Sequence, residues 1–171
     1  MNDRVTGLPN RSAFYAYLGR ALKAAHPPDQ AVSVVFLDLD DFKSLNETFG
    51  RQIGDAVLKA VGDRLTAAIR VPDMVSRMGN DEFGCLITGM PIEDPLCATA
   101  RTLLAAVSDP MIIGSIEFTV RASMGFATHT ADGSGANALM ERAARAMYRA
   151  KLDQSGYALF KCVRSKAEQQ R

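Results

Sequence analysis

Two adjacent carboxylates, Asp81 and Glu82, lie between two short apolar runs within residues 75–87. Gly79 and Asn80 precede them, and both residue types tolerate the positive φ that a tight hairpin turn needs. The spacing predicts a β-hairpin that turns at these two residues and holds the acids rigidly at its tip. Carboxylate oxygens are the ligands that hard divalent cations prefer, so the segment indicates a metal site.

A second pair of acids ends a predicted buried strand. Residues 32–39 form a β-branched, apolar run, and Asp38 and Asp40 lie at its end. Residues two apart on a strand share a face, so both acids are expected on one side of it. If this strand pairs with the hairpin, Asp38 and Asp81 can bind the same Mg²⁺ ion. Together, the two acidic strand ends favour a metal–nucleotide site.

The elements that position these acids follow from apolar periodicity and from chain breakers. Helices are predicted over residues 11–25, 42–49, 53–69, 94–108 and 138–154, and strands over 32–39, on both sides of the turn at 79–80, and over 111–113, 116–123, 124–128 and 157–160. Asn10 is the expected N-cap of the first helix, and a loop is expected over residues 130–136. Because hairpins and helices are interleaved rather than strictly alternating, an α+β sheet covered by helices is favoured over a doubly wound parallel fold.

The composition limits the class of protein. A chain of 171 residues, 47% of them hydrophobic, suits one domain with a substantial core. Its formal net charge of +1 argues against a nucleic-acid polymer or an anionic membrane as the main partner. Three scattered cysteines, no signal peptide and no long apolar span predict a cytoplasmic domain. The polar residues 161–171 are expected to form a tail or a linker toward a further module.

Several ordered motifs resemble one known family, the GGDEF (diguanylate cyclase) domains. The signature hairpin is present as Gly-Asn-Asp-Glu-Phe at residues 79–83, and Arg77 precedes it. The family pattern D-x-L-T-G-L-x-N-R is present as DRVTGLPNR at residues 3–11, and A-L-Y-x-A-K as AMYRAK at 146–151. The other matches are D-x-D-x-F-K-x-x-N at 38–46 and Gly-Asp at 54–55. The resemblance covers nearly the whole chain, so residues 1–160 are predicted to form one GGDEF domain.

The resemblance implies a fold and an activity. The implied fold is the ferredoxin-like nucleotide-cyclase palm, an α+β arrangement with a mainly antiparallel central sheet flanked by helices. Family members condense two GTP molecules into cyclic di-GMP and two pyrophosphates. The product is two-fold symmetric, so two domains that each hold one GTP must face each other as a homodimer. A flanking sensor or phosphodiesterase domain is expected in the full-length protein.

The resemblance also implies roles for individual residues. Mg²⁺ (or Mn²⁺) would be held by Asp38, the carbonyl group of Leu39, and Asp81. Asp81 would also ease deprotonation of the 3′-hydroxyl, with Glu82 as the neighbouring catalytic acid. The remaining substrate contacts would come from Asn46 and Asp55 at the guanine, from Lys43 and Lys151 at the phosphates, and from Gly79 and Asn80 at the turn. A carboxylate accepts hydrogen bonds from guanine N1 and N2, which adenine cannot donate in the same way.

Each of these residues also has a purely structural interpretation. Asp40 and Asp41 are typical helix caps, and Lys43 and Asn46 are typical of an exposed helix surface. Asp55 near a helix start and Lys151 near a helix end would each favour the helix dipole. It is the combined spacing that favours the functional interpretation.

A second candidate site is the Arg-x-x-Asp motif formed by Arg70 and Asp73, which has five residues between it and Gly79. In relatives a motif at this spacing binds cyclic di-GMP as an inhibitor, and Arg101 falls where a third contributing arginine is expected. Arginine forks suit phosphate oxygens and stack on guanine. The alternative is a surface Arg–Asp pair, which contributes little to stability.

Asn80 is the main departure from the family pattern, because it replaces the second glycine of the signature. Asn tolerates positive φ, but its carboxamide adds bulk where ribose and phosphate should lie. A displacement of about 1 Å in the reacting geometry costs roughly 100-fold in rate. The smaller departures are Ser155 in place of a phosphate-binding arginine, Arg51 in place of a histidine and Ala144 in place of an aspartate.

Three functions are compatible with these observations. The first is an active diguanylate cyclase with product inhibition. The second is a catalytically degenerate domain that binds GTP or cyclic di-GMP and reports occupancy to a neighbouring module, for example a phosphodiesterase. The third is a pure dimerisation element, which the retained carboxylates disfavour because unpaired buried charges are costly.

Overall fold

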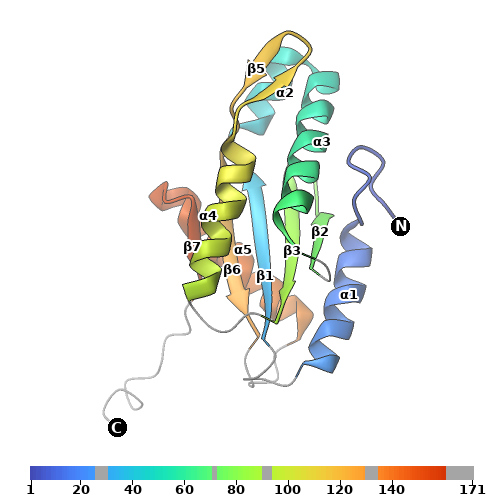
Figure 1. Cartoon of the computed structure of the whole chain (residues 1–171), viewed down its shortest axis with the longest axis vertical. Coiled ribbons are helices and arrows are strands. Elements are labelled where there is room, and N and C mark those ends of the chain that lie inside the picture. The colour runs from blue at the N-terminus through green and yellow to red at the C-terminus, as the bar shows by residue number, and fades with distance from the viewer. Residues whose placement is uncertain (26–30, 71–72, 90–93, 130–134, 161–171) are drawn as a thin grey trace.

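The computed structural model describes residues 1–25, 31–70, 73–89, 94–129 and 135–160. They form a mixed five-stranded sheet, a separate two-stranded ribbon and the helices that cover the sheet (Figure 1). The helices are α1 (Arg11–Ala24), α2 (Phe42–Phe49), α3 (Arg51–Ala68), α4 (Asp94–Ser108) and α5 (Ala136–Asp153). The strands are β1 (Val32–Leu39), β2 (Met74–Arg77), β3 (Glu82–Thr88), β4 (Met111–Ile113), β5 (Ile116–Phe118), β6 (Ala122–Thr128) and β7 (Tyr157–Leu159).

The main sheet has the order β2-β3-β1-β6-β7, and β4 and β5 form the ribbon. The pairs β2–β3, β3–β1 and β1–β6 are antiparallel, whereas β6 and β7 are parallel. The predicted α+β fold with a mainly antiparallel central sheet is therefore confirmed. Because β1 pairs with β3, the acid at the end of β1 lies beside the start of β3, with Asp38 opposite Glu82.

Side-chain alternation along β1 divides the core into two layers. Val35, Leu37 and Leu39 pack in one cluster with α3 and α4, whereas Val34 and Phe36 pack in another with α1 and α5. In Figure 1, α3 and α4 lie in front of the sheet and α5 lies behind it. Asp38 alternates with Leu37 and Leu39, so it lies on the face of the sheet that α5 covers.

Several predicted bounds agree with the structure, and others do not. The strand at residues 32–39 and the helices at 42–49 and 94–108 have the predicted bounds, and Asn10 accepts a hydrogen bond from Ala13 N at 2.9 Å as the N-cap of α1. The strand predicted over residues 116–123 is wrong, because the chain leaves the β4–β5 ribbon after residue 118 and joins the main sheet at residue 122. Of the loop predicted over residues 130–136, residues 130–134 lie outside the described part, as does the predicted tail at 161–171.

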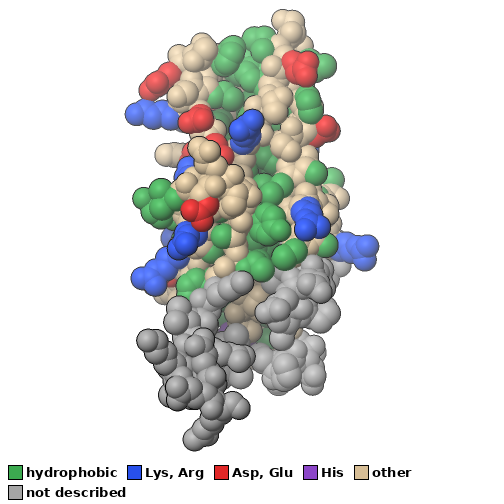
Figure 2. Space-filling view, turned by 90° about the vertical axis from the view of Figure 1, so that its left-hand side faces the viewer, with side chains coloured by type: hydrophobic (Ala, Val, Ile, Leu, Met, Phe, Trp, Pro, Cys, Tyr) green, Lys and Arg blue, Asp and Glu red, His purple; other side chains and the backbone are tan. Residues whose placement is uncertain are grey.

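The charge distribution on the surface and the polarity of the helices can be compared with the predicted partners. Figure 2 shows Lys/Arg and Asp/Glu side chains interspersed with apolar ones on the side of the molecule that it displays. Among the described residues, the helices are too short or too polar to cross a membrane.

Gly125 allows α5 to lie directly against β6. A Cβ atom at this position would lie 2.0 Å from the Ala143 carbonyl oxygen and 2.2 Å from the Met147 nitrogen, both of which belong to the backbone. We expect Gly125→Ala to lower the free energy of unfolding by about 3 kcal/mol or more, because the backbone of α5 must move away. Chemical denaturation measures this change. Gly19→Ala in α1 is the control: its Cβ would meet nothing within 4 Å, and we expect it to stabilise the protein slightly.

Candidate functional site

The acids at the end of β1 and before β3 converge. Leu39 N donates a hydrogen bond to Asp81 O at 3.0 Å, which fixes the two backbones together. Burial raises the pKa of Asp81 from 3.8 to about 6, together with the charge of Asp38 and a hydrogen bond to it. The Asp38 Oδ2 atom accepts a hydrogen bond from Lys151 Nζ at 2.6 Å, while the buried Oδ1 atom has no partner within the described residues.

This arrangement suits a divalent cation. The Asp38 charge raises the proton affinity of Asp81, and the buried Oδ1 of Asp38 has no partner among the described residues, so a positive charge between the two carboxylates would stabilise them. In the described part of the chain, no group of three or more His, Cys, Asp or Glu side chains could hold a metal ion. A site here would therefore need a backbone oxygen as its third protein ligand, the part that the carbonyl group of Leu39 is expected to take.

The signature turn is wider than predicted. It spans residues 78–81 between β2 and β3, and Met78 N and Gly79 N donate to Glu82 O at 2.8 and 3.4 Å. The prediction that Gly79 and Asn80 adopt positive φ is wrong, because neither is among the positive-φ residues of the described chain. A four-residue connection does not need the left-handed geometry of a two-residue hairpin turn. A Cβ at Gly79 would lie 2.8 Å from Glu82 Oε2, the end of a flexible side chain that can move away.

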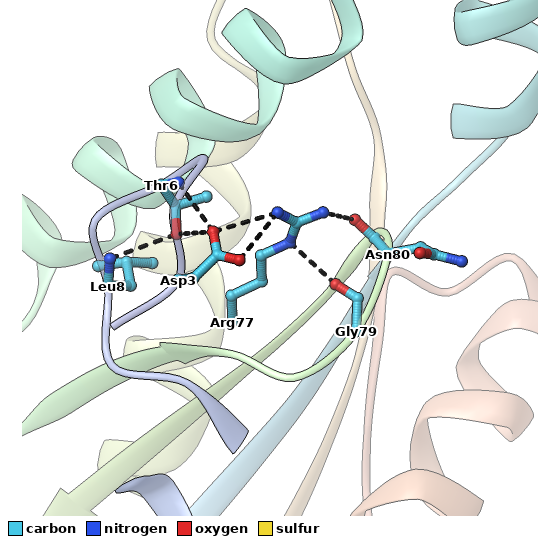
Figure 3. Close-up of polar contacts among 6 residues, drawn as sticks. All are labelled: Asp3, Thr6, Leu8, Arg77, Gly79 and Asn80. Atoms are coloured by element: carbon cyan, nitrogen blue, oxygen red, sulfur yellow. Dashed lines mark hydrogen bonds and ion pairs between the residues drawn. The ribbon is translucent and has the colours of Figure 1, made fainter. Parts of the chain in front are cut away.

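Arg77 holds this turn in place (Figure 3). Its Nε and Nη2 atoms donate to the carbonyl oxygens of Gly79 and Asn80 at 3.0 and 2.8 Å. Its Nη1 atom contacts both carboxylate oxygens of Asp3 at 3.1 Å. The planar guanidinium thus fixes two successive carbonyl groups of the turn directly before Asp81. Sequence reasoning gave Arg77 no role.

Asp3 is itself fixed by a turn near the N-terminus. Thr6 donates to Asp3 Oδ1 from both its backbone nitrogen and its hydroxyl group, each at 2.8 Å. Burial alone would raise the pKa of Asp3, but the hydrogen bonds from Thr6 and Arg77 more than offset this effect and lower the pKa. Gly7 completes the turn with a φ of 74°. The signal was present in the opening motif, where Asp, Thr and Gly are typical of such a turn.

Most of the predicted substrate contacts line one cleft of about 740 Å³ between α2, α3 and the signature turn. We call it the α2–α3 cleft. It is lined by Asp3, Val5, Phe42, Lys43, Asn46, Glu47, Arg51, Asp55, Leu58, Arg77, Asn80 and Asp81. The cleft therefore brings together the predicted guanine contacts, Lys43, Asn80 and the predicted metal ligand Asp81. Lys43 is exposed at its edge.

Asn46 depends on a neighbour that sequence reasoning did not assign a role. The Oδ1 atom of Asn46 is buried and has no hydrogen-bond partner within the described residues. A Cβ at Gly54 would lie 1.7 Å from this atom, so only glycine leaves room for the carboxamide in this orientation. Gly54 in α3 thus leaves room for the Asn46 carboxamide in this orientation, and the Oδ1 atom offers a hydrogen-bonding position to a ligand.

A second cleft of about 770 Å³ lies at the C-terminal end of α5. We call it the α5 cleft. It is lined by Asp40, Asp41, Leu45, Leu104, Ser108, Thr119, Val120, Arg121, Ala122, Ser123, Lys151, Gln154 and Gly156. Lys151 thus lines this cleft rather than the α2–α3 cleft, and its bond to Asp38 connects the two. Burial would lower the pKa of Lys151, but Asp38, Asp40 and Asp81 raise it.

The predicted capping of α2 by an aspartate side chain is wrong. Asp41 occupies the N-cap position, but it has a φ of 57° and its side chain makes no capping hydrogen bond. The Asp40 carboxylate instead accepts a hydrogen bond from Ser123 Oγ on β6 at 3.0 Å. Asp40 therefore forms a hydrogen bond with the neighbouring strand instead of capping α2.

Glu82 lines neither cleft among those described. It is the first residue of β3 and stands opposite Asp38 in the strand register. Its carboxylate folds over Gly79, as the 2.8 Å approach to a Cβ at that position shows. The structure therefore separates the two adjacent acids of the signature, with only Asp81 facing the α2–α3 cleft.

The two arginines of the predicted inhibitory site are exposed, whereas Asp73 is partly buried. Arg70 follows α3 and Arg101 lies on α4, two helices that pack against each other. Neither guanidinium has a hydrogen bond or an ion pair within the described residues, and residues 71–72 of the motif lie outside them. Asp73 does not pair with Arg70 through its side chain; its Oδ1 accepts from Thr88 N at 2.9 Å instead. The structural alternative considered from the sequence, an ion pair between the Arg70 and Asp73 side chains, is therefore not present among the described residues.

Comparisons with known proteins identify the family and the fold. The family described as "Diguanylate cyclase, GGDEF domain" matches residues 1–156. The Pseudomonas aeruginosa protein MucR, named a bifunctional diguanylate cyclase/cyclic di-GMP phosphodiesterase, is 37% identical over 94% of this chain, which spans 23% of that protein. The cyclic di-GMP phosphodiesterase PdeR of Escherichia coli is 35% identical over 87% of the chain and 22% of its own length.

Two solved structures show the same fold. The GGDEF domain of TpbB (YfiN) from Pseudomonas aeruginosa aligns with a TM-score of 0.85 at 31% identity, covering 94% of this chain and 95% of that one. The GGDEF domain of DgcB from Caulobacter crescentus, solved in complex with c-di-GMP, aligns with a TM-score of 0.82 at 27% identity over 93% and 94% of the two chains. The sequence motifs, the sheet and the two clefts thus have one explanation: the chain belongs to the GGDEF (diguanylate cyclase) domain family.

Proposed function

We propose that this domain is a diguanylate cyclase, which condenses two GTP molecules into cyclic di-GMP and two pyrophosphates as a homodimer. The observation that carries the proposal is the convergence of Asp38 and Asp81 beside the α2–α3 cleft. The Oδ1 atom of Asp38 is buried without a partner among the described residues, and the pKa of Asp81 is raised to about 6. A site of this kind is costly to the fold unless it is used.

The α2–α3 cleft recognises the base in this proposal. Asn46 offers a buried oxygen that no described residue contacts by a hydrogen bond, and Asp55 offers a carboxylate at the same cleft. Both accept hydrogen bonds from the N–H groups of the guanine edge, whereas adenine presents a different donor pattern. Phe42 and Leu58 supply apolar walls for the ring.

Asp81 is the group that takes the proton from the attacking 3′-hydroxyl. A carboxylate with a pKa near 6 is a stronger base than an ordinary aspartate and is still ionised at neutral pH. Arg77 and Asp3 hold the turn that carries it, so its position is set before substrate binds. Asp38, the carbonyl group of Leu39, and Asp81 would hold Mg²⁺ or Mn²⁺, which would supply positive charge against the triphosphate.

Turnover in an enforced dimer tests the proposal. The chain is fused to a parallel dimeric coiled coil and incubated with GTP and Mg²⁺, and cyclic di-GMP and pyrophosphate are quantified together. The proposal predicts one cyclic di-GMP for every two pyrophosphates. GTP binding without either product would reject the enzyme and support the alternative below.

The alternative is a degenerate GGDEF domain that acts as a GTP- or cyclic di-GMP-binding regulatory module. Asn80 favours it, because this residue lines the α2–α3 cleft where the family pattern has glycine. The relatives that are named phosphodiesterases also favour the regulatory alternative. In PdeR, the segment similar to this chain is about a fifth of the protein, and the remainder leaves room for other domains. A full-length protein with a sensor or phosphodiesterase module, located in the cytoplasm, suits both functions.

We also propose that Arg70, Asp73 and Arg101 bind the product. Both guanidinium groups are unpaired within the described residues, and forks of this kind bind phosphate oxygens. We expect Arg70→Ala to weaken cyclic di-GMP binding roughly tenfold or more, as measured by calorimetry, while GTP turnover without added product stays the same. Arg20→Ala on α1 is the control for removal of an exposed arginine. Equal affinity in the parent and in Arg70→Ala would remove this site from the proposal.

A further inference from the structure

We propose that Arg121 binds the terminal phosphates of the nucleotide in the α5 cleft. This inference rests on the proposed function and assigns a residue that neither the motifs nor the first cleft includes. Arg121 is exposed, and its guanidinium has no hydrogen bond or ion pair to any described residue. It lines the same cleft as Lys151. The α5 cleft therefore contains two cationic side chains from different elements.

The backbone places Arg121 on the correct side of the sheet. Asp40 N donates to Arg121 O at 2.8 Å, so this residue stays in register with the end of β1. Ser123, two positions further, lies opposite Asp38 and donates to Asp40. Since residues two apart on an extended chain share a face, Arg121 lies on the face with Ser123 and Asp38, which α5 covers.

The two clefts meet at the predicted metal ligands. Asp81 lines the α2–α3 cleft, Lys151 lines the α5 cleft, and Asp38 contacts both residues. A nucleoside triphosphate whose base lies in the α2–α3 cleft and whose phosphates pass these acids has its terminal phosphates directed into the α5 cleft. Arg121 and Lys151 are the cationic side chains that would contact the terminal phosphates in the α5 cleft.

The charges of the α5 cleft specify the kind of ligand. Asp40 and Asp41 balance the two cations, so the cleft has no excess of positive charge. We therefore expect a metal–triphosphate complex to bind, rather than a free anion. A guanidinium group can bind two phosphate oxygens at once, whereas a hydroxyl group such as that of Ser155 cannot. Ser155, where relatives carry a phosphate-binding arginine, donates its hydroxyl to Tyr157 O at 3.1 Å.

A phosphate-length series tests this assignment without turnover. The ligands are 3′-deoxyguanosine tri-, di- and monophosphate with Mg²⁺, which lack the attacking hydroxyl, and calorimetry gives each affinity. We expect Arg121→Ala to weaken triphosphate binding roughly 10- to 100-fold, the range for a charge-assisted hydrogen-bond pair, and to change monophosphate binding less than about twofold. Arg121→Lys should recover part of the loss.

The control is Arg145→Ala, which removes an exposed arginine of α5 that pairs only loosely with Glu141. It should change no affinity, and thermal unfolding of all variants should agree with the parent. Equal losses for all three ligands, or no loss for the triphosphate, would overturn the role of Arg121. A parent that binds none of the ligands would overturn the proposed function itself, whereas a parent that binds all three equally would overturn only the phosphate assignment.

Discussion

Asp81→Asn will abolish cyclic di-GMP formation and will also stabilise the metal-free protein at pH 7.5. We expect turnover to fall by roughly three orders of magnitude or more, because the variant loses both a base and a metal ligand. We expect the free energy of unfolding at pH 7.5 to rise by about 1 kcal/mol. At about 1.4 kcal/mol per pKa unit, the rise of the pKa from 3.8 to about 6 would give about 3 kcal/mol, and we expect less because Asp81 is partly exposed.

The sign of the stability change follows from linkage. The pKa of Asp81 is about 6 in the folded protein against 3.8 for an ordinary aspartate, so the folded state binds the proton more tightly than the unfolded state. Its favourable contribution is fully present below pH 3.8 and is lost as the pH rises from about 3.8 to about 6. At pH 7.5 the charge destabilises the fold, and the neutral carboxamide of Asn removes this cost.

Two measurements distinguish this effect from a general change in stability. The difference between parent and Asp81→Asn in urea unfolding should decrease as the pH is lowered and disappear below about pH 4. Added Mg²⁺ should raise the melting temperature of the parent but not of the variant. Asp63→Asn, which affects an exposed pair with Lys59, should show neither behaviour. Retained turnover in Asp81→Asn would contradict its assignment as metal ligand and base.

The parts of the fold that were predicted correctly are those with strong local signals. The β1 strand is a continuous β-branched run and α4 has a clear apolar repeat, so their bounds follow from the sequence. The break between β5 and β6 could not be predicted, because residues 116–128 remain extended while they pass from one sheet to another. The break is evident only from strand pairing, because β5 pairs with β4 whereas β6 pairs with β1.

The candidate site shows the same limit. Motif spacing was sufficient to predict that Asp38 and Asp81 come together, because strand pairing brings the two acidic segments side by side. Arg77 and Asp3 are 74 positions apart, and no local pattern indicates that they form a pair. The backbone of the signature turn was also predicted wrongly, since the loop length that decides its φ values depends on where β2 and β3 begin and end.

That error changes what Asn80 is expected to do. Because φ at residue 80 is not positive, Asn is not strained there, and the missing glycine matters only through the volume that the carboxamide occupies. Asn80 is exposed, lines the α2–α3 cleft, and directs its carboxamide away from Arg77 and Asp3 (Figure 3). The Arg77–Asn80 bond uses the backbone oxygen of Asn80, so any side chain at this position keeps it.

Asn80→Gly is therefore expected to raise turnover roughly 10- to 100-fold, the range that follows from relieving a displacement of about 1 Å in the reacting groups. GTP affinity should change little, because the base contacts lie on α2 and α3. Cyclic di-GMP formation by the enforced dimer measures the first quantity and calorimetry with 3′-deoxy-GTP the second. No gain in Asn80→Gly over an active parent would contradict the prediction.

Asn80→Ala separates the two possible effects of glycine. If the carboxamide is the obstacle, Ala should recover most of the gain, because it removes the three heavy atoms beyond Cβ and still restricts the backbone. If only Gly recovers activity, backbone freedom limits the rate, and the turn must change its conformation during the reaction. If the parent and both variants bind 3′-deoxy-GTP but produce no cyclic di-GMP from GTP as dimers, the clefts serve recognition alone. The regulatory alternative then replaces the cyclase, because the acids at the junction of the clefts would hold a nucleotide without acting on it.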